Sequence, residues 1–449
     1  MARVPTVAVI GAGYAGLACA VELARAGVHV TVFERSHTLG GRARVVHKDH
    51  QWRVDNGQHI LIGAYSELTR LMRVTGVSPK QLAHLPLTLH YPGRLHLQAA
   101  TLPAPFHLAA GLLRARGLSW GDRLAMLRLM RFLKKTGFRV APEWTVSELL
   151  RHTRQTATLV QLVWVPLCVA ALNTPADEAS AQVFANVLRD SLAAGAPASE
   201  LLLPRVDLSE LFPVPAARFL ATRRGKLRTG NAIDAITPVD GGFRLEGDPG
   251  SQPWPHVVVA TAPYHAGALL ASTGACERLA AQIDALPHEA IISVYLALGR
   301  GFRLPAPMIG LESSIDGEDA ARPAQWAFDR GQLGGPEGLI SIVISTPRAA
   351  AELERDELVL ATHRQLETQL GRTLPPPQWS QVIVEKRATL ACRPGINRPG
   401  LLTPLSGLWL AGDYLESDYP ATLESAARSG VACAQAILAR EGIPPAGAV

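Results

Sequence analysis

Three glycines close to the start of the chain constrain its fold more than any other feature. Gly11, Gly13 and Gly16 have the spacing G-x-G-x-x-G and follow an apolar run of β-strand character. The residues from about Tyr14 to Ala26 then predict a helix. A strand, a glycine-rich turn and a helix in this order predict the first unit of a Rossmann-type α/β domain.

This unit has the features that bind a dinucleotide. Gly11 permits the tight turn, Gly13 lets the backbone approach a pyrophosphate, and Gly16 allows close packing of the helix on the strand. Glu34 follows Gly11 by 23 positions, at the end of a second predicted strand, and can accept from ribose hydroxyls. The helix N-terminus favours the phosphates. The expected cofactor contacts are Gly11, Ala12, Gly13, Tyr14, Ala15, Gly16, Glu34 and Arg35.

A second turn, Gly40-Gly41-Arg42, narrows the choice of dinucleotide, because a guanidinium there can form bidentate contacts with phosphates. Here the chain resembles the glutathione-reductase-like FAD proteins. More narrowly, it resembles the amine oxidase and phytoene desaturase superfamily, whose N-terminal signature ends in the same Gly-Gly-Arg. The resemblance implies FAD rather than NAD. It also implies an α/β fold in which a glutathione-reductase-like Rossmann FAD-binding domain is interleaved with an α+β substrate-binding domain.

The far end of the chain supplies an independent match. Residues 407–413 predict a short buried strand, and residues 422–439 predict an alanine-rich helix. In the superfamily that the chain resembles, Gly412 and Asp413 would stand beside the flavin phosphate and ribityl chain. The helix that begins at Thr422 would direct its N-terminus, through the N–H of Leu423, at the flavin C2 carbonyl. Its dipole would stabilise reduced flavin.

The length of 449 residues, with 48% hydrophobic residues, predicts two domains. We expect an FAD-binding domain of residues 1–70, 205–265 and 380–445, and a substrate domain of residues 71–204 and 266–379. Within the first, residues 228–236 resemble the strand that places its backbone, at Ile233, beside the adenine.

Five scattered cysteines predict neither a disulfide framework nor a metal site, so no metal is expected. No secretory signal precedes the first predicted strand, which makes the cytoplasm the default location. The net charge of +6 is not accompanied by stacking aromatics among the basic residues or by a nucleic-acid motif. We therefore expect no nucleic-acid partner.

Two stretches of the predicted substrate domain bear on the substrate. The apolar run 159–172 is too short to span a bilayer and contains Pro166. It suits either ordinary core or the wall of an apolar cavity. Residues 107–135 have leucines and methionines near helical spacing together with seven Arg and Lys residues. This basic amphipathic pattern fits a solvated surface helix or a helix that contacts an anionic membrane surface.

The segment Asp55-Asn56-Gly57-Gln58-His59 lies where the backbone of this superfamily passes the flavin N5 edge. Gly57 allows close approach, and Gln58 and His59 are placed to hydrogen-bond N5 or a substrate oxygen. His59 is the candidate acid because an imidazole titrates near neutral pH. A histidine with a purely structural role is the alternative.

This DNGQH segment and the stretch GDYLESDYPATLESAARSG most resemble the squalene-associated FAD enzymes, the hydroxysqualene dehydroxylases of bacterial hopanoid synthesis. The resemblance implies reductive removal of an allylic hydroxyl from hydroxysqualene, giving squalene. Hydride would come from reduced flavin N5, and His59 would protonate the leaving hydroxyl. So apolar a substrate favours a peripheral position on the inner face of the cytoplasmic membrane, through residues 107–135.

Three alternatives stay open. Phytoene-type desaturases share the architecture and the apolar substrate but act in the oxidative direction. Flavin amine oxidases frame the amine with aromatic rings, whereas residues 387–393 and Thr422-Leu423 carry none. A non-catalytic prenyl-binding module would be expected to have a degenerate flavin site, and here the motifs are intact. The electron donor is not indicated by the sequence.

Overall fold

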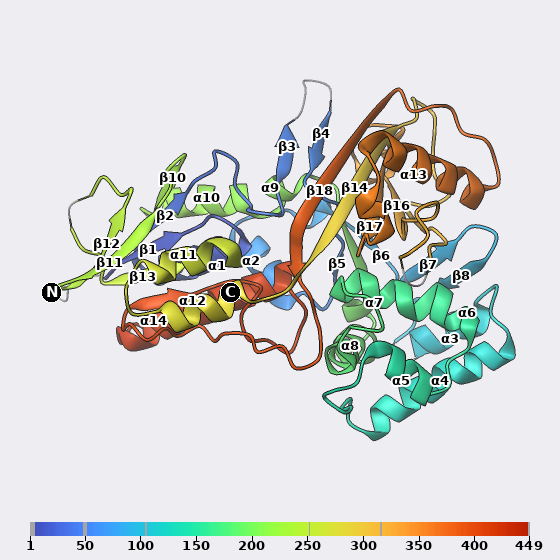
Figure 1. The fold of residues 1–449 in the computed structure, drawn as a ribbon, viewed down its shortest axis with the longest axis horizontal. Helices are drawn as coiled ribbons and strands as arrows, with labels where there is room; N and C mark the ends of the chain where they lie inside the picture. The colour runs from blue at the N-terminus through green and yellow to red at the C-terminus, as the bar shows by residue number, and fades with distance from the viewer. Residues whose placement is uncertain (1–4, 48–51, 104–105, 251, 315–316, 448–449) are drawn as a thin grey trace.

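A parallel five-stranded sheet organises one half of the molecule (Figure 1). The structure is a computed structural model that describes residues 5–447, apart from 48–51, 104–105, 251 and 315–316. The strand order is β10-β2-β1-β13-β19, and every neighbouring pair is parallel. The strands are β1 (Thr6–Ile10), β2 (His29–Glu34), β10 (Lys226–Thr229), β13 (His256–Val259) and β19 (Leu408–Leu410). Segments from the start, middle and end of the chain thus form one sheet, as the sequence predicts.

The alternation of side chains along β1 explains why both faces of this sheet are covered. Val7 and Val9 pack with α1 (Tyr14–Arg25), α10 (Pro213–Thr222) and α14 (Leu423–Arg440). Ala8 and Ile10 point to the opposite face. There they pack with the hairpin β11 (Ala235–Val239) and β12 (Gly242–Glu246), and with α11 (Pro263–Ala271) and α12 (Glu277–Asp284).

The two helices predicted from the terminal motifs lie against each other. A Cβ atom on Gly430 of α14 would stand 2.1 Å from the carbonyl oxygen of Ala15 in α1. Only a glycine therefore permits this closeness. The contact fixes the C-terminal helix beside the N-terminal dinucleotide unit.

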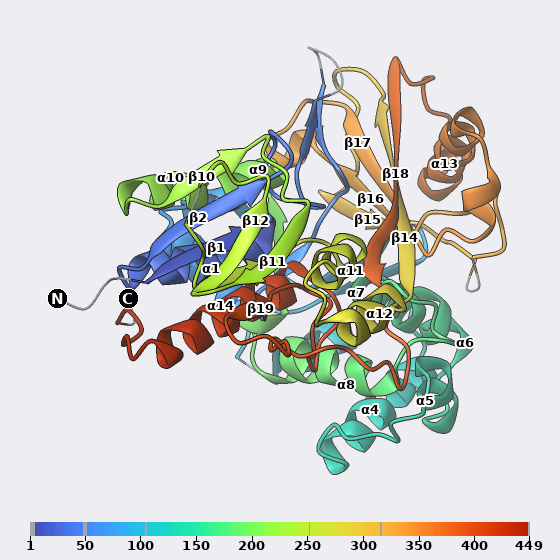
Figure 2. The same ribbon diagram turned by 60° about the vertical axis from the view of Figure 1, so that its left-hand side comes forward.

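A second sheet forms the other half of the molecule, with α13 (Arg355–Leu370) packed against it (Figure 2). Its order is β15-β16-β17-β14-β18, and all its pairs are antiparallel. The strands are β14 (His288–Ala297), β15 (Met308–Gly310), β16 (Trp326–Asp329), β17 (Leu339–Ser345) and β18 (Trp379–Leu390). The lower end of β14 and β18 reaches toward the first sheet in Figure 1.

Helices form a third layer below the second sheet in Figure 1. They are α3 (Phe106–Arg114), α4 (Trp120–Lys135), α5 (Val146–His152), α6 (Ala157–Leu159), α7 (Val165–Leu172) and α8 (Ala181–Leu188). The shorter connecting elements are α2 (Ser66–Val74), α9 (Leu208–Leu211), β3 (Val45–His47), β4 (Arg53–Asp55), β5 (Leu61–Ile62), β6 (Leu82–Leu85), β7 (Thr88–Tyr91), β8 (Leu95–Gln98) and β9 (Leu201–Pro204).

The basic stretch 107–135 forms two helices, where the sequence suggested one continuous amphipathic pattern. Gly117 has φ of +87°, and a Cβ atom there would stand 1.9 Å from the carbonyl oxygen of Arg94. The next helix, α4, has Ser119 as its N-cap, and the side chains of Ser119 and Asp122 form a capping box. A turn that only glycine accommodates and a strong N-cap together break the helix.

The apolar run 159–172 is helical but not uniformly α-helical. Val160–Trp164 forms a π-helical turn that leads directly into α7. Pro166 lacks an N–H, so a widened turn ahead of it accommodates the missing hydrogen bond. No helix in the described part of the chain is long and apolar enough to cross a bilayer.

Two of the expected domain boundaries do not coincide with the points where the chain passes from one sheet to the other. Residue 265 falls inside α11, and both α11 and α12 pack on the first sheet. Residue 380 falls inside β18, which belongs to the second sheet. The division into two domains stays a prediction. Because α12 packs on the first sheet and β14 belongs to the second sheet, the chain passes between the two sheets near residue 287.

Candidate functional site

A cavity of about 770 Å³ extends from the first sheet to the second. The carboxyl ends of β1 and β2 and the start of α1 line one part of it, as expected for a ligand site in a doubly wound sheet. Residues of α7, β14, β16, β17 and β18 line the other part. One continuous space therefore joins a nucleotide groove to the interior of the second half.

The three glycines of the first turn have the geometry that a dinucleotide requires. A Cβ atom on Gly11 would stand 2.7 Å from Ala260 O, and one on Gly16 would stand 2.0 Å from Gly11 O. These two glycines therefore permit close packing within the protein. A Cβ atom on Gly13 would meet no atom within 4 Å. The space at Gly13 is open toward the cavity, which is where the pyrophosphate is expected.

Glu34 is held in place by backbone donors. Its carboxylate accepts from the N–H of Ala12 at 2.7 Å and from the N–H of Ser36 at 2.8 Å. Each carboxylate oxygen keeps lone pairs for further donors, such as ribose hydroxyls. Arg35 is 70% exposed and lies 3.5 Å from Asp234, while Ile233 is buried on the cavity wall.

Arg42 and Asp413 come from opposite ends of the chain and form an ion pair. Arg42 Nη2 lies 2.6 Å from Asp413 Oδ1, and Nη1 donates to the carbonyl of Ala388 at 2.7 Å. Burial lowers the pKa of Arg42, but the attraction of Asp413 outweighs it and the net pKa is raised. The pair joins the Gly40-Gly41-Arg42 turn to the Gly412-Asp413 segment on the cavity wall. Contact of Arg42 with the phosphates stays a prediction.

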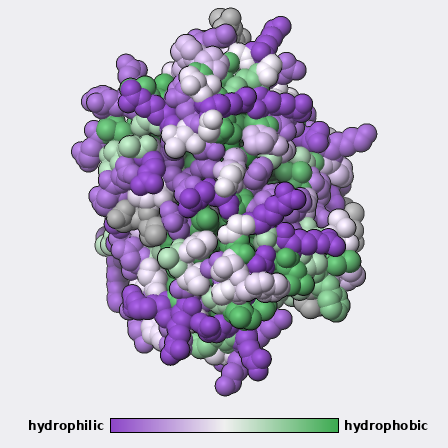
Figure 3. Space-filling model, turned by 90° about the vertical axis from the view of Figure 1, so that its right-hand side faces the viewer, coloured by the Kyte–Doolittle hydropathy of each residue, from purple (hydrophilic) through white to green (hydrophobic). Residues whose placement is uncertain are grey.

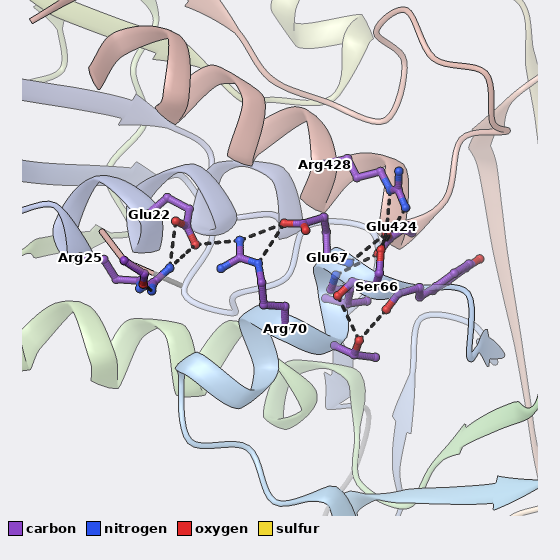
Figure 4. A network of polar contacts seen from close by, with 11 residues as sticks. Glu22, Arg25, Ser66, Glu67, Arg70, Glu424 and Arg428 are labelled. Carbon is purple, nitrogen blue, oxygen red and sulfur yellow. Dashed lines mark hydrogen bonds and ion pairs between the residues drawn. The ribbon is translucent and has the colours of Figure 1, made fainter. Parts of the chain in front are cut away.

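The N-terminus of α14 is anchored by a buried carboxylate (Figure 4). Glu424 accepts from the N–H groups of Glu67 and Leu68, at 3.0 and 2.9 Å, and thereby caps α2. Arg428 Nε donates to the same carboxylate at 2.7 Å. Arg70 extends the network to Glu22 of α1. These contacts fix the helix end that carries Thr422 and Leu423 at the cavity.

The structure brings together nearly all of the sequence-predicted cofactor residues. Ala12 and Gly16 do not line the cavity: Ala12 positions Glu34, and Gly16 packs against Gly11. The predicted residues that do line it are Gly11, Gly13, Tyr14, Ala15, Glu34, Arg35, Gly40, Gly41, Arg42, Gly57, Gln58, His59, Ile233, Gly412, Asp413, Thr422 and Leu423.

Gly57, Gln58 and His59 also line the cavity. Gly57 has φ of +155°, in a region that favours glycine. Gln58 Oε1 accepts from Arg330 Nη1 at 3.1 Å. His59 Nδ1 lies 3.0 Å from the carbonyl oxygen of Gly57, so Nδ1 carries the proton and donates. Burial lowers the pKa of His59, which keeps the neutral imidazole dominant near neutral pH.

The deeper part of the cavity is walled largely by apolar and aromatic side chains. The sequence pointed only to the 159–172 run for this wall, and Val169 and Ala171 do line it. The contribution of the second sheet could not be recognised, because the sequences of β14, β16 and β17 are those of ordinary buried strands. The missed lining residues of these strands are Ile291, Trp326, Phe328, Val343 and Ser345. Polar groups at its margin include Asn173, Glu385 and Thr389.

Asp55, two residues before Gly57, is a buried carboxyl group that sequence analysis did not single out. It accepts from the N–H of Leu208 at 2.9 Å. Burial raises its pKa to about 7, although this hydrogen bond and the charge of Arg330 act in the opposite direction. Asp207 raises the pKa further, and Arg53 lowers it.

We expect Asp55→Asn to stabilise the protein at alkaline pH. The pKa of Asp55 in the fold is above the value of about 3.9 for an unfolded chain, so its favourable contribution is complete below pH ~4. That contribution is lost as the pH rises through about 7. The variant, which is always neutral, should gain about 4 kcal/mol over wild type at pH 8, since about three pKa units are involved, and almost nothing at pH 4. Denaturant unfolding at both pH values measures this, and an equal difference at both would contradict it.

The residues on the cavity wall fit FAD: an open space at Gly13, a fixed carboxylate at Glu34 and a helix N-terminus at Leu423. The sequence profile described as flavin containing amine oxidoreductase matches residues 14–438. The chain belongs to this family. Its cofactor is FAD, and it is an oxidoreductase.

Several relatives of this flavin amine oxidoreductase match over nearly their whole length. The hydroxysqualene dehydroxylases of Rhodopseudomonas palustris and Zymomonas mobilis are each 29% identical, over 97% and 96% of this chain and 98% of theirs. The 15-cis-phytoene desaturase of Synechococcus elongatus is 23% identical, over 97% of this chain and 96% of its own.

Solved structures share the fold at lower identity. A putative protoporphyrinogen oxidase from Exiguobacterium superposes with a TM-score of 0.69 at 17% identity, over 98% of this chain and 99% of its own. Cyclohexylamine oxidase from Brevibacterium oxydans gives a TM-score of 0.65 at 17% identity, over 98% and 100%. The predicted glutathione-reductase-like α/β architecture is confirmed.

Proposed function

We propose that this flavin amine oxidoreductase removes the hydroxyl group of hydroxysqualene reductively and gives squalene, as a step of bacterial hopanoid synthesis. The observation that carries the proposal is the apolar chamber that continues from the flavin groove between α7 and the second sheet. The near full-length relatives named hydroxysqualene dehydroxylase support the same substrate.

The reaction replaces a C–O bond by a C–H bond and releases water. When bound, reduced FAD supplies the hydride that goes to the allylic carbon. The protein must supply a proton to the leaving hydroxyl, and it must exclude bulk water from the developing allylic cation. The apolar wall does the second, and His59 is our candidate for the first.

The geometry of His59 defines how it would act. Because Nδ1–H is engaged with the carbonyl of Gly57, the free nitrogen Nε2 bears a proton only in the imidazolium form. Gln58, held by Arg330, would orient the substrate oxygen beside it. His59 is thus an acid whose active form is populated as the pH falls.

The peripheral membrane position is part of this proposal. Transfer of a chain of some thirty carbons from lipid to water would cost on the order of 20 kcal/mol, at about 0.8 kcal/mol per CH₂. Free diffusion of the substrate through the cytosol is therefore excluded on energetic grounds. The enzyme would take its substrate at the inner face of the cytoplasmic membrane.

Phytoene desaturation is the second candidate, favoured by the same apolar chamber and by the desaturase relatives. Anaerobic incubation of the photoreduced enzyme with hydroxysqualene, presqualene alcohol or phytoene, in detergent, separates the candidates. We expect squalene from hydroxysqualene, detected by mass, with reoxidation of the flavin. Desaturation of phytoene by the oxidised enzyme instead, or oxidation of an amine, would overturn the proposal.

A further inference from the structure

Apolar side chains are exposed mainly in one region of the molecule. Of the nine large apolar side chains that are exposed among the described residues, six lie between residues 102 and 127. We call them the α3–α4 face: Leu102, Phe106, Leu113, Trp120, Leu124 and Leu127. Figure 3 shows hydrophobic side chains next to hydrophilic ones in the lower part of the face on which the helical layer lies. Such a concentration marks an interaction surface.

The periodicity of α4 places its apolar and basic side chains on one side. Trp120, Leu124 and Leu127 are 70%, 62% and 52% exposed and recur at a spacing of three or four residues. Arg131 and Lys134 continue the same exposed row toward the C-terminus. The opposite side packs into the core through Ala125, Leu129 and Leu133. The exposed row therefore faces solvent and is not needed for the packing of α4 on the core.

The exposed charged side chains of the stretch 101–140, which contains the α3–α4 face, are all basic. Asp122 is the single acidic residue between positions 101 and 140, and it is buried in the capping box. The exposed basic residues of the same stretch are Arg114, Arg116, Arg128, Arg131, Lys134, Lys135 and Arg139. Apolar side chains with tryptophan, bordered by exposed cations, complement an anionic lipid surface.

Arg123 has a different role from the other basic residues. Its guanidinium donates to the carbonyls of Leu112, Leu118 and Ala115, at 3.0, 2.6 and 2.7 Å. It also lies over the ring of Trp120, 5.0 Å from the centroid. Arg123 thereby locks the end of α3 against the start of α4, so the face is preformed.

The α3–α4 face is joined to the segment that walls the chamber. Asp122 Oδ1 accepts from Thr156 at 2.6 Å, and Gln155 Nε2 donates to the carbonyl of Ala125 at 2.8 Å. Gln155 Oε1 accepts in turn from Trp164 Nε1 at 2.8 Å. Trp164 ends the π-helical turn that leads into α7, and α7 lines the chamber.

We propose that the α3–α4 face docks the enzyme on an anionic phospholipid bilayer and holds the α7 wall of the chamber near the lipid. The proposal rests on the proposed function for its purpose, because an apolar substrate must be taken from lipid. Leu102, Phe106, Leu113, Trp120, Leu124 and Leu127 enter the acyl region. The exposed arginines and lysines contact headgroup phosphates.

Vesicle flotation of the FAD-loaded full-length protein tests the docking. We use phosphatidylcholine vesicles with about one-third phosphatidylglycerol, and vesicles of phosphatidylcholine alone. Wild type should float with the anionic vesicles. The double variant Trp120→Ser, Leu124→Ser should have a partition coefficient at least about tenfold lower. The double variant Arg131→Gln, Lys134→Gln should bind the anionic vesicles more weakly and leave binding to phosphatidylcholine vesicles unchanged. Leu360→Ser and Arg364→Gln, exposed on α13, serve as matched controls.

Each outcome of the flotation bears on the proposal. Failure of wild type to float, or equal flotation of all variants, overturns it. A wild-type dimer in sedimentation that the Trp120→Ser, Leu124→Ser variant dissociates, without flotation, assigns the face to a second copy and also overturns it. Flavin absorbance and melting temperature show that each variant is folded. Turnover of hydroxysqualene in detergent reports on the proposed function separately, because docking is not needed there.

Discussion

Gly13→Val should yield a colourless but folded protein. Gly13 has φ of −78° and ψ of 179°, which any residue adopts, and its added Cβ would meet no protein atom within 4 Å. The valine side chain would instead project into the cavity, where the pyrophosphate is expected to approach the backbone. We expect FAD affinity to fall at least about 1,000-fold, which corresponds to about 4 kcal/mol. Titration of apoprotein with FAD measures this.

Two other glycines make this test specific. Gly400→Val adds the same side chain at an open position away from the cavity and should stay yellow. Gly16→Val places a Cβ 2.0 Å from Gly11 O and should lower the melting temperature of the apoprotein itself. Gly13→Val apoprotein should melt like wild-type apoprotein. A yellow Gly13→Val protein with wild-type affinity would show that the pyrophosphate lies elsewhere.

His59→Gln should slow a single turnover of hydroxysqualene by about 10²- to 10⁴-fold, the usual contribution of a general acid. Glutamine keeps a donor for the Gly57 carbonyl but has no titrating proton. Anaerobic mixing of reduced enzyme with substrate, followed by flavin reoxidation, measures the rate. His84→Gln, which alters an exposed histidine paired with Glu200, is the matched control.

The pH dependence distinguishes an acid from a structural histidine. Burial lowers the pKa of His59 below its usual value near 6.5, so imidazolium accumulates only as the pH falls below that value. The wild-type rate should therefore rise as the pH is lowered from 7.5 toward 5.5, while the His59→Gln rate stays flat. A variant rate within about twofold of wild type at low pH, or an equal slope in both proteins, would assign His59 a structural role.

The flavin half could be predicted because its signals are local in the sequence. The spacing of Gly11, Gly13 and Gly16 and the position of Glu34 belong to a single βαβ motif, and the structure brings Gly11, Gly13 and Glu34 to the cavity wall. Helix ends were also predicted closely, since α1 covers Tyr14–Arg25. The break at Gly117 was missed, because an isolated glycine in a helical pattern becomes decisive only when the carbonyl of Arg94 lies beside it.

For the substrate half, the sequence indicated apolar segments but not which residues form the cavity wall. The run 159–172 was compatible with ordinary core or with an apolar wall. Its partners Trp326, Phe328 and Val343 stand more than 150 positions later, in strands with no distinguishing pattern. Asp55 likewise gave no sign of its raised pKa. Its burial depends on residues near Leu208 and Arg330 that are remote in sequence.

The sequence by itself determined a dinucleotide site, since such a site is built from backbone turns and helix ends that short motifs specify. It also determined that a basic, apolar stretch lies near residue 120. Only the tertiary structure decided which side chains wall the chamber, which nitrogen of His59 is free and which face of α4 is exposed. These depend on contacts between distant segments, and burial and pairing are properties of such contacts and not of a residue's neighbours in the chain.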